Sequence, residues 1–344
     1  MNIKKTFNQI RVIFFGGISA LVLLNLILFF YMYYPLARPN EYNTTDYTFE
    51  PNRIYFWMYE GIAYGKTDSA GFNNNQFISK PDIIILGSSH MQAKEVMPKY
   101  NVANQLQSNL VNSGYNFSVY NMGISSHGFI KCLKYLKNTT AHSEKYIVIE
   151  TSDIDFSGEE IESLLQYSLS RIQINTYNNK IINFVRRLPL YQILRTQQTQ
   201  GLIKVFLGKN TSTNQSLSTT QENITQISAN YEKLFSYIEE NSDGRQIIVF
   251  YHPTGMPTAN GKLEYITSES YLEEFKLASK RHGIIFLDLT EETEKLWQTE
   301  HKTTHGFTTG TAFSGHLNKN GHRIAARKLA DCIIQNEENS DVAF

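Results

Sequence analysis

Five short apolar runs, each followed by a helix-like stretch, constrain the fold of this 344-residue chain more than any other feature. The runs cover residues 83–86, 117–120, 146–149, 247–250 and 284–287. The helix-like stretches cover residues 94–110, 129–136, 229–240, 271–281 and 319–335. Alternation of this kind is typical of a parallel sheet covered by helices on both faces. The sequence therefore predicts a three-layer α/β/α domain around a five-stranded parallel sheet.

The amino terminus carries an apolar run over residues 12–34, with no charged residue between Arg11 and Arg38. This run is long enough to cross a hydrocarbon layer of about 30 Å as a helix, and a buried core helix is rarely so uniformly apolar. Basic residues precede it, so the positive-inside rule predicts a cytoplasmic tail (1–11), a single-pass anchor in the cytoplasmic membrane (12–34) and an extracytoplasmic remainder. A cleaved signal peptide is the alternative, but residues 32–38 form a poor cleavage site.

The rest of the chain divides into a tether and a domain with an insertion. Residues 35–53 are polar and contain three prolines, which predicts a spacer between the membrane and the domain at 54–344. An insertion is expected at 158–226, with helix-like stretches at 161–172 and 181–194 and a loop-like polar segment at 209–221. Arginines alternate with apolar residues in this insertion, which suits either a solvated helix face or a membrane surface.

Charge and cysteine content exclude several classes of function. The 32 basic and 32 acidic residues balance, and no basic block is present, so nucleic acid is not an expected partner. Aromatic residues make up 13% of the chain, which suits a carbohydrate-binding surface but also an ordinary core. Cys132 and Cys332 lie outside any C-x-x-C pattern, which argues against redox chemistry or structural zinc. They are either free thiols or, outside the cytosol, a disulfide pair.

Two polar motifs carry the chemistry. The first apolar run ends at Gly87-Ser88-Ser89-His90, and the motif from His316 to His322 precedes the last helix-like stretch. A serine there lies at the carboxyl edge of a parallel sheet, where the backbone N–H groups of the next helix can stabilise an oxyanion. A serine hydroxyl needs an imidazole base, and His316 is the candidate. The alternative is a plain turn in which serine caps the helix.

These motifs resemble the SGNH/GDSL hydrolase superfamily, and the anchor resembles its membrane-anchored extracytoplasmic branch. The resemblance implies a flavodoxin-like fold, Ser89 as nucleophile and His316 as base. It also implies an oxyanion hole from the N–H groups of Ser89 and Gly123. The family's third block is Gly-x-Asn-Asp, whereas residues 150–153 read Glu-Thr-Ser-Asp, so Ser152 stands where the asparagine donor is expected.

The resemblance does not supply the acid that orients the histidine. The family has an aspartate three residues before the base, where this chain has Phe313. The resemblance therefore implies a Ser-His dyad, with a backbone carbonyl or Ser314 left to fix the tautomer of His316.

Other polar residues near the expected sheet edge are candidates for substrate binding: His90, Asn121, His127 and His252. Asn121 also fits a simple turn, and local hydrogen bonding is the ordinary role for each of these histidines. His301, His305 and His316 have the spacing of a zinc site, but they lack a helical scaffold and the glutamate of H-E-x-x-H. We therefore expect no metal and no cofactor.

The resemblance implies a serine esterase or O-acyltransferase that acts on an acylated cell-surface polysaccharide through an acyl-enzyme. Relatives with such an anchor include exopolysaccharide O-acetyltransferases and the D-alanine transfer protein of teichoic acid, often paired with a multispanning acyl-exporting membrane protein. A catalytically silent protein that binds polysaccharide or scaffolds its assembly is the alternative. It is motivated by Phe313 and by the altered third block.

Overall fold

A five-stranded parallel sheet forms the centre of the computed structural model, which describes residues 3–39, 47–138, 144–167, 180–196, 224–310 and 312–342. In chain order the strands are β6 (Ile83–Leu86), β7 (Val119–Asn121), β8 (Tyr146–Thr151), β9 (Gln246–Tyr251) and β12 (Ile285–Asp288). Their spatial order is β7-β6-β8-β9-β12, and every neighbouring pair is parallel. This flavodoxin-like order confirms the predicted fold class.

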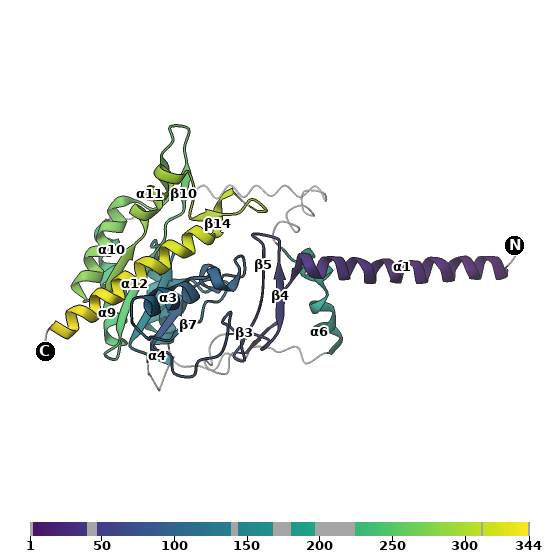
Figure 1. Cartoon of the computed structure of the whole chain (residues 1–344), viewed down its shortest axis with the longest axis horizontal. Coiled ribbons are helices and arrows are strands. Elements are labelled where there is room, and N and C mark those ends of the chain that lie inside the picture. The colour runs from purple at the N-terminus through teal and green to yellow at the C-terminus, as the bar shows by residue number, and fades with distance from the viewer. Residues whose placement is uncertain are drawn as a thin grey trace.

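Helices cover both faces of the sheet (Figure 1). One face packs on α3 (Val102–Asn112), α11 (Thr290–Glu300) and α12 (Lys319–Val342). Helix α3 begins later than residue 94, because Pro98–Tyr100 forms a 3-10 turn and the Asn101 side chain caps the helix by accepting the N–H of Asn104.

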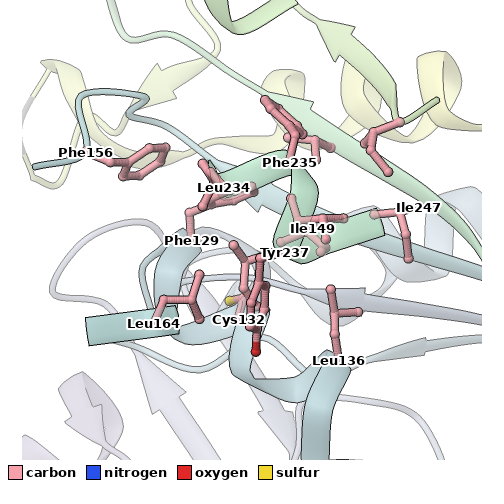
Figure 2. Close-up of a cluster of buried hydrophobic side chains, with 14 of the residues drawn as sticks. Phe129, Cys132, Leu136, Ile149, Phe156, Leu164, Leu234, Phe235, Tyr237 and Ile247 are labelled. Carbon is pink, nitrogen blue, oxygen red and sulfur yellow. The ribbon is translucent and has the colours of Figure 1, made fainter. Parts of the chain in front are cut away.

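The opposite face of the sheet packs on four helices around a core rich in aromatic and branched side chains (Figure 2). These are α4 (Phe129–Asn138), α5 (Gly158–Leu165), α9 (Ile224–Glu240) and α10 (Glu269–Arg281). Figure 2 shows Phe129 and Cys132 of α4 pointing toward Leu234 and Tyr237 of α9. Neither Cys132 nor Cys332 forms a disulfide bond among the described residues.

The amino-terminal helix α1 (Ile3–Tyr31) projects from the domain (Figure 1). Its most apolar window, within residues 5–31, is 0% buried, as expected for a membrane anchor or a signal sequence.

The structure differs from the predicted tether at 35–53. Strand β1 (Met32–Tyr33) pairs with β4 (Ile54–Trp57), which pairs with β5 (Ala63–Lys66). Strand β2 (Ala37–Pro39) pairs with β3 (Tyr47–Phe49). Tyr34, Tyr55 and Trp57, which flank this segment, are buried together, and Phe49 of β3 packs against them. The described part of the segment therefore folds against a small aromatic core.

The described part of the insertion contains α5, α6 (Lys180–Arg187) and α7 (Pro189–Leu194). The predicted helix at 181–194 is split, because Pro189 starts a new helix at its first position. The end of the predicted helix at 161–172 and the polar segment at 209–221 lie outside the described residues. Two hairpins complete the domain: β10 (Gly255–Pro257) with β11 (Leu263–Tyr265), and β13 (His305–Gly306) with β14 (Ala312–Leu317).

Candidate active site

Ser89 is the first residue of the short helix α2 (Ser89–Gln92), which follows β6 at the carboxyl edge of the sheet. The four residues of β6 are fully buried, so the strand fixes where the turn begins. The Ser88 hydroxyl caps α2 by accepting the N–H of His90 at 3.2 Å. These local contacts hold the Ser89 hydroxyl at the edge where parallel sheets bind ligands.

His316 on β14 lies beside this serine. Its Nε2 is 2.9 Å from Oγ of Ser89, and its side chain keeps 25% of its surface exposed. The structure therefore brings together the predicted nucleophile and base, although 227 positions separate them. The spacing allows direct proton transfer.

Glu60 supplies a carboxylate that the sequence did not reveal. Its Oε2 lies 2.6 Å from Nδ1 of His316, and its Oε1 accepts the backbone N–H of His316 at 2.9 Å. This carboxylate fixes the His316 tautomer that presents Nε2 to the serine. The alternatives considered for that role, Ser314 and a backbone carbonyl, are therefore not needed. Phe313 points elsewhere and is 43% exposed.

Two glycines let Glu60 approach the histidine. Gly315 has a positive φ of 89°, and a Cβ there would lie 2.4 Å from Oε1 of Glu60. Gly61 also has a positive φ, and a Cβ there would lie 2.1 Å from the carbonyl oxygen of Glu95. The N–H of Gly61 donates to Oγ1 of Thr309, which ties the Glu60 segment to the loop before β14. Side chains at either position would push the carboxylate away.

Electrostatics around His316 favour a strong base. Burial lowers the pKa of His316, but the Glu95 and Glu60 carboxylates raise it more, so the net value lies above the ordinary one. Burial raises the pKa of Glu60, but hydrogen bonding to His316 and its charge outweigh this and leave the carboxyl more acidic than usual. Glu95 Oε1 lies 3.7 Å from Nδ1 of His316, and burial raises the pKa of this second carboxyl.

The predicted oxyanion donors differ in their surroundings. The N–H of Ser89 has no acceptor among the described residues and is free to face a substrate. The N–H of Gly123 instead donates to Oδ1 of Asn121 at 2.8 Å, so it is already occupied in this structure. Asn121 is buried, and its Nδ2 donates to the carbonyl of Met91. Asn121 thus holds the turn rather than facing a ligand.

Ser152, the third predicted donor, lines a cavity of about 570 Å³ beside the serine turn. Ser88 and Glu150 line the same cavity, which runs between β8, α4 and α5. No contact joins Ser152 to Ser89 among the described residues, so its role in an oxyanion hole stays a prediction. The cavity offers both Lys131 and Asp153 to a polar ligand.

A buried series of hydrogen bonds through His252 and His305, called the histidine relay below, supports the serine turn. Glu150 accepts the N–H of Ser88 at 2.7 Å through Oε2 and contacts Nε2 of His252 at 2.6 Å through Oε1. Nδ1 of His252 is 3.1 Å from Nε2 of His305, whose Nδ1 lies 3.0 Å from Oγ1 of Thr304. Burial raises the pKa of Glu150, but the hydrogen bonds from His252 and Ser88 and the charges of His252 and His90 together outweigh it, and the net pKa is about 2.

The other histidines predicted to contact substrate also make contacts within the protein. His252 is buried within this relay. The Nδ1 of His90, which is only partly buried, accepts the N–H of Leu317 at 3.1 Å, which joins the serine helix to the strand that carries His316. His127 is buried against Tyr47, and burial lowers its pKa to about 4. A substrate contact by any of these three histidines stays a prediction.

Three histidines could in principle hold a metal ion. His90, His252 and His305 each offer a nitrogen within 4.8 Å of the others, whereas His301 ends α11 and is not part of this group. Nδ1 of His90 accepts a backbone N–H, so the Nε2 of a neutral ring carries the proton and is not a ligand. The hydrogen bonds of the relay satisfy the other two rings.

Comparisons with known proteins give structural likeness only. No family model and no curated protein matches the chain. The structure is similar to the acetyl xylan esterase AlAXEase, with 12% identity, a TM-score of 0.39 and coverage of 73% of this chain and 99% of that chain. It is also similar to a lipolytic G-D-S-L family protein from Veillonella parvula, with 12% identity, a TM-score of 0.37 and coverage of 72% and 96%.

Proposed function

We propose that this protein is a membrane-anchored serine esterase or O-acyltransferase that acts on an acylated polysaccharide outside the cytoplasmic membrane. The hydrogen-bonded series Ser89, His316 and Glu60 carries the proposal, since its two links measure 2.9 Å and 2.6 Å. A carboxylate, an imidazole and a hydroxyl in this order form the triad of serine hydrolases.

The mechanism follows from these contacts. His316 takes the proton of Ser89 as the hydroxyl oxygen attacks the ester carbonyl, and the Ser89 N–H stabilises the oxyanion. The imidazolium then gives its proton to the departing alcohol, which leaves an acyl-enzyme on Ser89. Water or a sugar hydroxyl, deprotonated by His316, attacks this ester and releases the acyl group. Glu60 stabilises the imidazolium in both halves of the reaction.

The anchor and the substrate class have different support. Helix α1 has the length and hydropathy of a membrane span, and the basic residues before it favour a cytoplasmic amino terminus. The polysaccharide substrate follows from the resemblance of the sequence motifs to anchored SGNH enzymes. On that resemblance a multispanning acyl exporter is the expected partner.

A serine-directed probe tests the chemistry. The full chain, Ser89→Ala and Ser108→Ala are compared for labelling by a fluorophosphonate and for hydrolysis of p-nitrophenyl acetate. We expect Ser89→Ala to lose labelling and about 10⁴-fold or more in kcat, whereas Ser108→Ala, an exposed serine on α3, keeps both. Equal labelling of all three proteins would refute the serine mechanism and favour the silent scaffold.

A second assay separates hydrolysis from transfer. The full chain is given an acetylated donor with and without an oligosaccharide acceptor, and acetate and acetylated sugar are quantified. A transferase forms acetylated sugar at the expense of free acetate, whereas a hydrolase forms only acetate.

A reporter fusion tests the orientation in the membrane. A reporter fused after Phe344 is expected to be active only outside the cytoplasm, and cytosolic activity would reverse the proposed topology.

A further inference from the structure

A second cavity, of about 760 Å³, lies where α1 leaves the domain. Its walls come from β1 and the segment that follows it, from β2 and β3, and from the helices α6 and α7 of the insertion. Helix α7 packs against α1, and α6 packs against α7. The N–H of Leu190 in α7 donates to Oδ1 of Asn25 in α1 at 3.2 Å, and the amide of Gln192 bonds both backbone polar groups of Tyr34. The cavity is therefore fixed to the anchor helix.

The depth of this contact places the cavity at a bilayer surface. A helix rises about 1.5 Å per residue, so Asn25 lies roughly 9 Å before Tyr31, the last residue of α1. If α1 spans the membrane, helices bound at Asn25 reach the boundary between headgroups and acyl chains. Helix α6 suits that depth, because Ile181 and Phe184 are 74% and 63% exposed.

The charge of the cavity is strongly positive, whereas the whole chain is neutral. Five basic residues and one acidic residue line it. The Glu50 carboxylate pairs with Arg187. Among the described residues Arg38, Lys94 and Arg195 form no ion pair, and Nε of Arg38 is buried without a hydrogen-bond acceptor.

Aromatic rings complete the lining. The Lys94 ammonium lies 4.0 Å from the ring centre of Trp57 and 5.4 Å from that of Tyr34, so rings rather than carboxylates hold it. Burial lowers the pKa of Lys94, which indicates that its charge is poorly solvated. Aromatic and cationic side chains together are typical of proteins at the headgroup level of a membrane.

We propose that this cavity binds the phosphate headgroup of an anionic phospholipid of the outer leaflet, with the acyl chains alongside the apolar face of α6. The guanidinium groups of Arg38 and Arg195 hold the phosphate oxygens, and Trp57 and Tyr34 flank the glycerol region. The proposal rests on the proposed anchoring by α1 but not on the chemistry at Ser89.

Trp57 provides the readout, because Trp297 on α11 is the only other tryptophan in the sequence. The full chain with Trp297→Phe is placed in phosphatidylcholine nanodiscs that contain either brominated phosphatidylglycerol or brominated phosphatidylcholine. Each basic side chain near an anionic surface contributes about 1 kcal/mol, so we expect at least tenfold preference for the anionic lipid in Trp57 quenching. Equal quenching by the two lipids would overturn the proposal.

Two double variants provide the matched comparison. Arg38→Gln with Arg195→Gln should reduce the preference for phosphatidylglycerol to less than threefold. Arg323→Gln with Arg327→Gln removes the same charge from exposed positions on α12 and should leave the preference intact. Circular dichroism melts of all proteins check folding. An unchanged preference in a folded Arg38→Gln, Arg195→Gln protein would contradict the assignment of the two arginines.

The source of the phosphate is tested by competition. Inorganic phosphate and glycerol phosphate at millimolar concentration should not relieve the quenching by brominated phosphatidylglycerol. Relief by either would assign the cavity to a soluble anion instead of a lipid.

Extraction with alkaline carbonate tests the anchor separately. Release of the full-length chain would refute the proposed anchoring, whereas retention without lipid preference would refute only the lipid site.

Discussion

At the scale of single residues, the site depends on the distance between Glu60 and His316. The carboxylate makes two contacts with the same residue, one to Nδ1 and one to the backbone N–H, so it fixes both the ring and the strand that carries it. The nearby Glu95 carboxylate lies too far from the ring, at 3.7 Å, to replace the hydrogen bond.

Removing the Glu60 charge should therefore slow catalysis and move its pH dependence. Glu60→Gln should reduce kcat by about 10²- to 10⁴-fold, because the imidazolium loses its stabilising carboxylate. Activity requires neutral His316, whose pKa is raised in the intact protein, so the wild-type rate should rise with pH through a midpoint above about 6.5. In Glu60→Gln that midpoint should fall. Rates measured from pH 5 to 9 decide this, and Glu60→Asp should restore part of the activity.

Glu60 could not have been predicted from the sequence, whereas Ser89 and His316 could. Ser89 follows a buried apolar strand and His316 precedes a helix, so both have a recognisable local setting. Glu60 lies in a segment before the sheet, 256 positions from the histidine, and no spacing rule connects them. The contact between Glu150 and His252 could not be predicted either, because it arises only when β8 and β9 pair in the sheet.

At the scale of elements, helix α2 positions the nucleophile through close backbone packing. A Cβ on Gly123 would lie 2.4 Å from the backbone of Met91 and Gln92, so the loop after β7 touches α2 with no room for a side chain. His90 on α2 in turn bonds the backbone of Leu317 on β14. The serine helix is therefore held between the loop after β7 and the strand β14, which carries His316.

Gly123→Ala should displace α2 and reduce both stability and activity. Overpacking against a backbone typically costs about 1–3 kcal/mol, and a shift of about 1 Å at the reacting atoms can reduce the rate 10²-fold. Urea unfolding and kcat/KM measure the two effects. Gly158→Ala is the control, since a Cβ there meets nothing closer than 3.7 Å. Equal behaviour of the two variants would show that α2 is not held as described.

The regular strands and helices could be predicted because buried positions recur at a fixed spacing in each of them, so their apolar residues form a recognisable pattern in the sequence. All five sheet strands lie within two residues of their predicted ends, since each contains an apolar run, and four of the five are largely buried. Strands β2 and β3 in the segment at 35–53 were not predicted, because each is only 3 residues long and Tyr47–Phe49 becomes a strand by pairing with Ala37–Pro39. Short strands of this kind depend on tertiary packing more than on local propensity.

At the scale of the whole molecule, several buried histidines make the fold sensitive to acid. His322 is fully enclosed, both of its ring nitrogens lack a hydrogen-bond partner among the described residues, and burial lowers its pKa to about 3. The folded protein thus binds this proton less readily than the unfolded chain. Its contribution to stability is complete above about pH 6.5 and is lost as pH falls toward 3.

Replacing this histidine with an apolar residue should flatten the acid limb of the stability curve. His322→Leu should raise the free energy of unfolding at pH 5 by about 1 kcal/mol or more, because no unpaired polar ring is then buried or charged. The partly buried His282 gives the opposite sign: burial lowers its pKa, but Glu239 and Glu232 raise it more, so His282→Gln should lose stability below pH 6.5. Urea titrations at pH 5, 7 and 9 compare both variants.

The position of the acid in the chain limits how far the chemistry can reach. Glu60 lies two residues after Met58, whose N–H donates to the carbonyl of Tyr31 at 2.8 Å, the final residue of α1. No slack chain separates that helix from the carboxylate. With α1 in a bilayer, the reactive serine would be held at a constant height above the lipid. Under the proposed function, an acceptor polymer could then react only where it comes close to the membrane surface.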